Sequence, residues 1–299
     1  MAKILNYGSL NLDYVYNVPH FVSAGETLSS YNMEVICGGK GLNQSIALAR
    51  GGARVFHAGK IGFNGGMLEN ILKENNVDTS YLLKDEKENG HAIIQVDKTG
   101  QNCILLFSGS NGKIEKDEID STLENFEKGD YIILQNEISN VPYIIEKAYE
   151  KGLFTVFNPS PITDDILSYP LDKISLLILN EVEGKAITGE EEPDRIIEKL
   201  FENYKGIRVL LSLGTKGSVY ADENKKIKAG IFKAKAVDTT AAGDTMLGFF
   251  VSALSKGMDE RDALILATKA SAIAVSRKGA APSIPTLSEA EKCDFEYIE

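Results

Sequence analysis

The chain has 299 residues, 43% of them hydrophobic, and a formal net charge of −11 at pH 7. This apolar fraction suffices for a large core, and the charge argues against nucleic acid as a partner, although a local field can still hold an anionic nucleotide. No apolar run approaches the roughly 18 residues of a membrane span, no signal peptide is expected, and three cysteines without C-x-x-C spacing indicate reduced thiols. We therefore expect a cytoplasmic protein with no membrane partner.

Short apolar runs alternate with helical patterns along most of the chain. We expect strands at residues 3–7, 55–57, 131–135, 154–158, 176–179 and 209–212. We expect helices at residues 42–50, 67–75, 141–151, 194–204, 244–256 and 260–276. Strands that are apolar on both faces and alternate with helices predict an α/β protein with a mostly parallel sheet covered by helices.

A glycine cluster in residues 37–41 runs into the first of these helices, with Asn43 and Gln44 in its first turn. Glycines allow close backbone approach, and the two amides offer directed donors and acceptors, which suits a polyhydroxylated ligand. The cluster is not a P-loop, because Lys40 is followed by Gly41, and no G-x-G-x-x-G follows the first strand. Cys37, beside the cluster, is interpreted as a packing residue and not as a nucleophile.

Residues 91–96 and 102–107 are period-two strands joined by a turn at 97–101, which predicts a β-hairpin. A hairpin fits poorly in a βαβ succession, so we assign it to a separate small sheet completed by residues 14–18 and 31–36. An edge hairpin on the main sheet is the alternative. Its apolar residues, Ile93, Ile94, Ile104 and Leu105, would suit a dimer contact.

Small residues, a glycine and a carboxylate precede the apolar run that starts at Met246. The first N–H groups of a helix have no intrahelical partner and attract an anion such as phosphate. The cap roles are open to Asp238, Thr239 and Thr240, so Asp244 is better explained as a proton acceptor beside a transferring phosphoryl group. From this segment alone, a helix N-terminus with a first-turn acid and no chemistry is an equal alternative.

Together, these two segments resemble the paired signatures of the ribokinase family of sugar kinases, the PfkB carbohydrate kinases. The matching patterns are Gly38-Gly39-Lys40-Gly41-x-Asn43 and Asp238-Thr-x-Ala-Ala-Gly-Asp244. Five further landmarks follow in the order that the family has them, at residues 8–13, 158–161, 180–183, 213–217 and 277–285. Within the family, the resemblance is greatest to the ribokinase branch.

This resemblance implies a three-layer α/β/α fold with a small β-sheet lid, in a single kinase domain spanning residues 1–299. The lid strands, inserted at about residues 12–36 and 90–108, would cover the sugar and often join two subunits, so a homodimer is expected. It further implies an ATP-dependent phosphotransferase acting on a primary hydroxyl, with D-ribose as lead substrate and ribose 5-phosphate as product. Asp244 would be the base, and the N–H groups of Ala241, Ala242, Gly243 and Asp244 an anion hole.

The resemblance also assigns ligand sites. The sugar would be held by Asn11, Asp13, Gly39, Lys40, Asn43, Glu137 and Asp244. ATP would lie against Asn180, Thr215, Gly217 and Thr268. Mg²⁺ would be held mainly by phosphates and water, with Glu183 acting through water; without the resemblance, Glu183 would rank as an ordinary exposed helix acid. An activating K⁺ would lie near Asp238, Thr240, Gly279 and Ser283.

Two departures from the family pattern leave alternatives open. Many relatives have glycine at the position of Ala241, so we expect a slightly bulkier but intact anion hole. The lid is the least distinctive part of the match, so fructose, 2-deoxyribose, another pentose or a nucleoside remain alternative acceptors. Tyr14, Tyr16 and Tyr31 are the candidates for a base-binding slot. A non-catalytic sugar or nucleotide sensor is the alternative of another class, although it would be expected to have lost Asp244 or the glycines.

Overall fold

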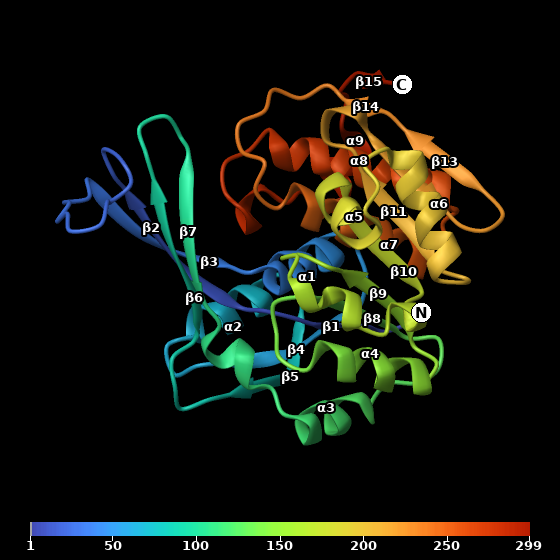
Figure 1. Ribbon diagram of the computed structural model, residues 1–299, viewed down its shortest axis with the longest axis horizontal. Coiled ribbons are helices and arrows are strands. Elements are labelled where there is room, and N and C mark those ends of the chain that lie inside the picture. Colours follow the sequence, from blue (N-terminus) through green and yellow to red (C-terminus); the bar gives the residue numbers. More distant parts are fainter. Residues whose placement is uncertain (1) are drawn as a thin grey trace.

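The computed structural model describes residues 2–299, and a nine-stranded sheet forms its centre (Figure 1). Its strand order is β13-β12-β11-β10-β9-β8-β1-β4-β5. The strands from β11 to β5 run parallel, whereas β12 is antiparallel to β11 and β13 to β12. The bounds are β1 (Ile4–Tyr7), β4 (Val55–Ile61), β5 (Asp78–Lys84), β8 (Tyr131–Gln135), β9 (Phe154–Asn158), β10 (Leu176–Asn180), β11 (Arg208–Ser212), β12 (Ser218–Ala221) and β13 (Lys226–Ala229).

Helices cover both faces of this sheet, because its central strands are apolar on both sides. Ile4 packs into one core and its neighbour Leu5 into the other. The first core is shared with α1 (Lys40–Arg50), α2 (Gly66–Glu74), α7 (Ala242–Ser255), α8 (Glu260–Val275) and α9 (Leu287–Lys292). The second is shared with α3 (Lys116–Leu123), α4 (Val141–Glu150), α5 (Glu181–Thr188) and α6 (Pro193–Asn203). The expected three-layer α/β/α architecture is confirmed.

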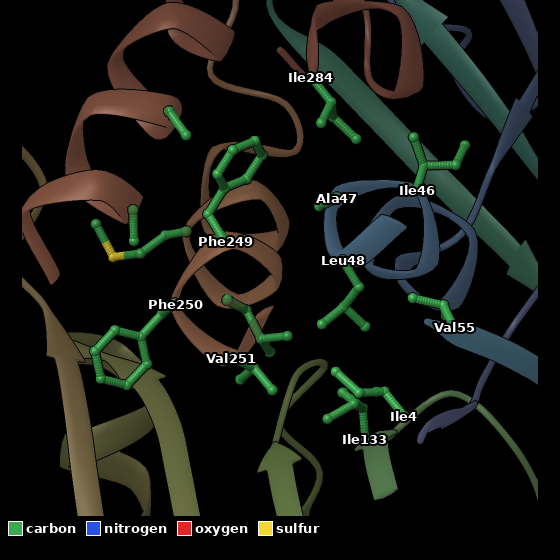
Figure 2. Packing of buried hydrophobic residues seen from close by; sticks show 14 of the residues in the cluster. Ile4, Ile46, Ala47, Leu48, Val55, Ile133, Phe249, Phe250, Val251 and Ile284 are labelled. Atoms are coloured by element: carbon green, nitrogen blue, oxygen red, sulfur yellow. The ribbon is translucent and has the colours of Figure 1, made fainter. Parts of the chain in front are cut away.

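Helices α1 and α7, which carry the two signature segments, pack directly against each other. A side chain at Gly248 would place its Cβ 2.3 Å from the Cβ of Ala47, so only glycine permits this approach. Figure 2 shows Ala47 and Leu48 of α1 beside Phe249 and Val251 of α7. The close crossing brings two segments about 200 residues apart into one site.

The four remaining long strands form a separate sheet of order β3-β2-β6-β7 that projects from the body, at the left of Figure 1. It contains β2 (Asn11–Asn17), β3 (Asn32–Gly38), β6 (Gly90–Val96) and β7 (Asn102–Phe107). We call it the lid sheet. Strands β6 and β7 form the predicted hairpin. Its assignment to a separate small sheet is confirmed, and the alternative, an edge hairpin on the main sheet, is wrong. Strand β2 is antiparallel to β3 and parallel to β6.

Several short elements had no prediction: β5, β12, β13, α3, α5, α9, the small pair β14 (Ile231–Phe232) and β15 (Tyr297–Ile298), and five 3₁₀ turns. Those turns are η1 (Gly109–Lys113), η2 (Asp164–Ser168), η3 (Leu171–Lys173), η4 (Gly214–Lys216) and η5 (Ala281–Ser283). Across residues 2–299, none of the helices combines the length and the apolar character that a membrane crossing requires.

Candidate active site

Asp244 lies in the first turn of α7 with its side chain buried against α1. Asn43 donates from Nδ2 to its Oδ2 at 3.1 Å, and Gln44 donates from Nε2 to its Oδ1 at 2.8 Å. The structure therefore brings the predicted Asn43 and Asp244 together. Gln44 was absent from the predicted site residues, although its amide and its place beside Asn43 were visible signals.

The chain turns sharply just before Asp244. Ala241, the N-cap of α7, has φ 61° and ψ 9°, in the left-handed region that costs a non-glycine residue free energy. Its carbonyl accepts from the N–H of Thr245 at 2.8 Å, and the N–H of Ala242 donates to the carbonyl of Thr239 at 3.3 Å. The extra methyl group of Ala241 is thus carried by a strained backbone. The anion-hole role of residues 241–244 stays a prediction.

The predicted sugar-binding carboxylates approach the glycine cluster from two sides. Asp13 comes from β2, and a Cβ on Gly38 would lie 2.0 Å from its Oδ2, so the missing side chain makes room for the carboxylate. Glu137, just after β8, accepts from the Ser9 hydroxyl and, at 3.0 Å, from the backbone N–H of Lys40. Gly39, between them, has φ 95°.

These groups perturb one another's ionisation. Burial, with a smaller contribution from Glu137, raises the pKa of Asp13 to about 7. Burial also raises the pKa of Glu137, although Lys40 opposes the change. Burial opposes the charge of Lys40, but the carboxylates of Asp244, Glu137 and Glu183 outweigh it and hold the pKa of Lys40 above its ordinary value. Lys40 is thus the cation of a carboxylate-rich site, and perturbed ionisation of this kind is typical of functional sites.

Asn11 is oriented by a residue that sequence reasoning missed. Asn111, in η1, accepts from the N–H of Leu10 at 3.1 Å and donates from Nδ2 to Oδ1 of Asn11 at 2.8 Å. The backbone donor fixes the Asn111 amide, which in turn fixes that of Asn11. Asn11 therefore keeps its own NH₂ group for a ligand.

Three of the four predicted nucleotide residues, Asn180, Thr215 and Gly217, lie at or just after the ends of β10 and β11, which are paired in register at Asn180 and Ser212. The η4 turn, with Thr215, follows β11, and Gly217 after it has φ 90°. Thr268 comes from α8, where its hydroxyl donates to the carbonyl of Leu264 at 2.8 Å. That hydroxyl is therefore engaged by its own helix.

Asn180 and Glu183 form a reciprocal cap at the start of α5. Asn180 Oδ1 accepts from the N–H of Glu183 at 2.9 Å, and Glu183 Oε2 accepts from the N–H of Asn180 at 3.0 Å. Glu183 is only 7% exposed, and burial raises its pKa. Glu183 is therefore not the ordinary exposed helix acid that it would be taken for without the family resemblance, because the cap turns its side chain back into the site.

The predicted cation loop is held together by one carboxylate. Asp238 accepts from the N–H of Thr240 at 2.9 Å and from the N–H of Gly279 at 2.9 Å, and so joins the two loop segments. Burial opposes its charge, but these hydrogen bonds hold the pKa of Asp238 below its ordinary value. Ser283 donates to the carbonyl of Ala280 at 2.7 Å.

Two features outside this site carry no catalytic signal. Cys37 is buried, and burial raises the pKa of its thiol, as expected of a packing residue. A cavity of about 560 Å³ is lined by residues of other segments, including Lys60, Lys113 and Lys116. Each of these lysines already has a partner: Glu118 at 2.7 Å, Asp85 at 4.0 Å and the Tyr143 ring at 4.9 Å.

Comparison with known proteins agrees with this site. The model of the pfkB family carbohydrate kinases matches residues 1–287. The chain is 35% identical over 313 residues to a ribokinase of Haemophilus influenzae, covering 100% of this chain and 99% of the relative.

Two solved structures share the fold, which confirms the expected ribokinase-like architecture. The ribokinase of Cryptococcus neoformans in complex with ADP has a TM-score of 0.84 and 31% identity, covering 98% of this chain and 99% of the other. The ribokinase of Arabidopsis thaliana complexed with ribose and ATP has a TM-score of 0.84 and 27% identity, covering 97% and 98%. With its two signature segments meeting at Asp244, this chain belongs to the pfkB family of carbohydrate kinases.

Proposed function

We propose that this enzyme is an ATP-dependent ribokinase that phosphorylates the primary hydroxyl of D-ribose to give ribose 5-phosphate. The observation that carries the proposal is the position of Asp244. It lies in the first helical turn of α7, held by amides of α1, beside a cluster of buried sugar-type donors and acceptors. The relatives named above, of which one was solved with ribose and ATP and another with ADP, support the same substrates.

Asp244 accepts the proton as the sugar oxygen attacks the terminal phosphate in line, and the bond from that phosphate to ADP breaks. The N–H groups of Ala241, Gly243 and Asp244 face the phosphoryl oxygens, where such preorganised donors are worth roughly 2.7–4 kcal/mol each, whereas that of Ala242 donates to the carbonyl of Thr239. Lys40 balances the carboxylates around it. The lid sheet covers the sugar and excludes water, which otherwise competes as acceptor.

Ribose is favoured by the pattern of donors and acceptors in the sugar site. Asn11 presents an NH₂ group, Glu137 presents an acceptor, and the Asp13 carboxyl can donate or accept because its pKa is raised to about 7. A small polyol with several hydroxyls can satisfy both kinds of partner. Tyr14, one candidate for a base slot, packs edge-on against His91 with ring centroids 5.7 Å apart, which leaves ribose ahead of a nucleoside.

We also propose that the reaction uses Mg²⁺ and is activated by K⁺. In residues 2–299 no group of three or more His, Cys, Asp or Glu is arranged to hold a metal ion. The buried carboxylate of Glu183 and the amide of Asn180 fit an ion carried mainly by phosphates and water, which neutralises charge on the transferred group. The oxygen-rich loops joined by Asp238 fit a monovalent cation, with Thr240, Gly279 and Ser283 nearby.

The lid sheet is the proposed contact of a homodimer. All six residues of β7 are exposed, among them Ile104 at 51% and Leu105 at 67%. The cytoplasm is the proposed location, in keeping with three free cysteines. We further propose that residues 1–299 act as one kinase domain with the lid strands inserted in it.

The test is ADP release with Mg-ATP and K⁺ across ribose, 2-deoxyribose, fructose, other pentoses and nucleosides. We expect turnover on ribose and a loss of about 10²–10⁴-fold in kcat for Asp244→Asn. Parallel assays with EDTA and with K⁺ replaced by a bulky organic cation test the two ions. Turnover on another acceptor alone would reject ribose, and no turnover by folded protein that binds ATP would favour the sensor.

A further inference from the structure

A chain of buried polar side chains lies behind Asp244 and connects it to the central sheet. Gln44 Oε1 accepts from Nε2 of Gln135, on β8, at 2.7 Å. The same Nε2 donates to Oδ1 of Asn6, on β1, at 2.9 Å. Asn6 in turn donates from Nδ2 to the carbonyl of Gly41 at 2.7 Å. Asn6, Gln44 and Gln135 are all 0% exposed, so these bonds form away from water.

The direction of this chain is fixed at both ends. The carbonyl of Gly41 can only accept, so the Asn6 NH₂ group must face it and Asn6 Oδ1 must face Gln135. Gln135 must then present its NH₂ group to Asn6 and Gln44 alike, which leaves Gln44 only its own NH₂ group for Asp244. The ionised Asp244 carboxylate, an acceptor, requires that same orientation.

This orientation leaves one buried acceptor without a hydrogen bond. Gln135 Oε1 is buried and has no hydrogen-bond partner. Flipping the Gln135 amide would set its oxygen against two other acceptors, Asn6 Oδ1 and Gln44 Oε1. A buried polar chain is stable only when its donors and acceptors alternate, so the orphan oxygen is the smaller cost.

We propose that Gln44 is a positioning residue for phosphoryl transfer: its NH₂ group, oriented through Gln135 and Asn6 by the Gly41 carbonyl, holds Oδ1 of Asp244. The inference rests on the proposed function of Asp244 as the base. Holding one oxygen stops the carboxylate from rotating and leaves Oδ2, shared with Asn43, to meet the acceptor hydroxyl. Gln44 itself takes no proton.

Two apolar substitutions of similar length test this role. Gln44→Met removes the donor to Asp244, and we expect kcat to fall by about tenfold to a hundredfold, as for small misplacements of reacting groups. KM values for sugar and ATP should stay near those of the wild type, because neither ligand loses a contact. A lowered melting temperature with unchanged kcat would mean that Gln44 is only structural.

Gln135→Met tests whether the effect travels through Gln44. It removes two donated bonds and touches neither Asp244 nor, on the proposed site, a substrate. We expect a smaller fall in kcat, and the double variant should have the kcat of Gln44→Met alone. If the falls in kcat of the two single variants multiply in the double variant, Gln135 does not act through Gln44 and this part of the proposal is overturned. Thr155→Val is the matched control, since this buried hydroxyl has no partner, and it should leave kcat unchanged.

A spectroscopic test reads the chain direction without any activity. Asn6 Nδ2 also donates to Ser45 Oγ at 2.8 Å, and Ser45 Oγ lies 2.8 Å from Nδ1 of His57. In the assigned direction Ser45 Oγ accepts from Asn6, and Nδ1 of His57 is then the acceptor available to the Ser45 proton. This predicts the His57 proton on Nε2, an atom that has no partner of its own. Burial lowers the pKa of His57 to about 3, so the ring is neutral at pH 7.

With only three histidines, ¹⁵N-histidine spectra of a His20→Gln/His91→Gln variant report His57 alone. The Nε2–H tautomer is expected. The Nδ1–H tautomer would contradict the assigned direction, because the Ser45 proton would then find its acceptor in a flipped Asn6 amide. The two proposals fail differently. If the wild type phosphorylates no sugar, the proposed function falls and the tautomer still decides the direction. If Asp244→Asn abolishes turnover while Gln44→Met keeps kcat, only the positioning role falls.

Discussion

At the junction of α1 and α7 both carboxylate oxygens of Asp244 are hydrogen-bonded and a single methyl group at Gly248 would not fit. In the lid sheet, by contrast, all six residues of β7 are exposed. The junction holds the carboxylate of Asp244 in one position, as the proposed phosphoryl transfer requires. Nothing in the single chain covers this strand of the lid sheet. The proposed chemistry thus lies at the closely packed junction, and the proposed choice of acceptor lies beside the exposed sheet.

Asp13 lies on the boundary between the two regions, and its pKa of about 7 makes it a test of the comparison. Between pH 4 and 7 the folded state keeps a proton that the unfolded state has lost, so the free energy of unfolding falls as pH rises. The slope is at most about 1.4 kcal/mol per pH unit. In Asp13→Asn this slope should be largely gone, so the variant gains stability relative to wild type as pH rises, while KM for ribose increases.

Chemical denaturation of both proteins at pH 4, 5, 6, 7 and 8 measures this difference. The curves should meet near pH 4 and diverge up to pH 7, since Asp13 is protonated in both states at low pH. Parallel curves would mean that the lid side of the site is as well solvated as an open surface. The contrast with the buried junction would then be lost.

Gly248→Ala tests the closeness of the junction directly. Its Cβ would lie 2.3 Å from the Cβ of Ala47, so α1 and α7 must separate. We expect a loss of about 1–3 kcal/mol in the free energy of unfolding, and a lower kcat because Asp244 moves relative to Asn43. Gly66→Ala is the control, since a Cβ there meets nothing within 4 Å. Equal stability of the two variants would show that the junction yields easily.

Much of the fold could be predicted from the sequence, because long periodic segments carry their own signal. The six expected strands and six expected helices are present with ends shifted by a few residues, except that β4 runs on to Ile61. The missed strands are of another kind. Residues 226–229 alternate lysine with Ile227 and Ala229 at the sheet edge, and only their antiparallel partner β12 makes them a strand.

The contact between Asn43 and Asp244 joins two residues that local motifs point to, whereas the buried partners behind them come from distant segments and were missed. Asn43 and Asp244 each lie in the first turn of a helix, next to a glycine-containing segment that is recognisable in the sequence. Gln135 is an unremarkable residue at the end of an apolar strand, and its partners are 91 and 129 positions away. Such pairings follow from strand order, with β8 beside β1, which no local pattern encodes.

Leu105→Asp tests whether a second copy covers the lid sheet. A charge on this exposed apolar strand should break a dimer, so that light scattering gives the 32.6 kDa of one chain in place of twice that mass. Melting of the separated chain should change little, because the substitution is on the surface. Tyr149→Asp, on an exposed position of α4, is the control that should leave assembly intact.

Ile104→Asp separates the two faces of the lid sheet. Ile104 and Leu105 point to opposite sides, and the strand register places Ile104 on the side of Asp13. If only Leu105→Asp gives single chains, the second copy lies on the side away from the sugar. If light scattering gives the mass of one chain for the wild type, the proposed dimer is contradicted. The lid sheet would then cover the sugar without help from a second copy.

Ala241→Gly should have the smallest effect, and it asks whether the rigid region carries strain. A left-handed backbone costs a non-glycine residue roughly 1–2 kcal/mol, while glycine adds about 0.5–1 kcal/mol of unfolded-chain entropy. The variant should therefore be as stable as wild type or up to about 1.5 kcal/mol more stable, with kcat unchanged. Ala242→Gly, one residue later in regular helix, should instead lose up to about 1 kcal/mol. If Ala241→Gly lowers kcat at unchanged stability, the methyl group shapes the anion hole, and the strain at this turn is retained for catalysis.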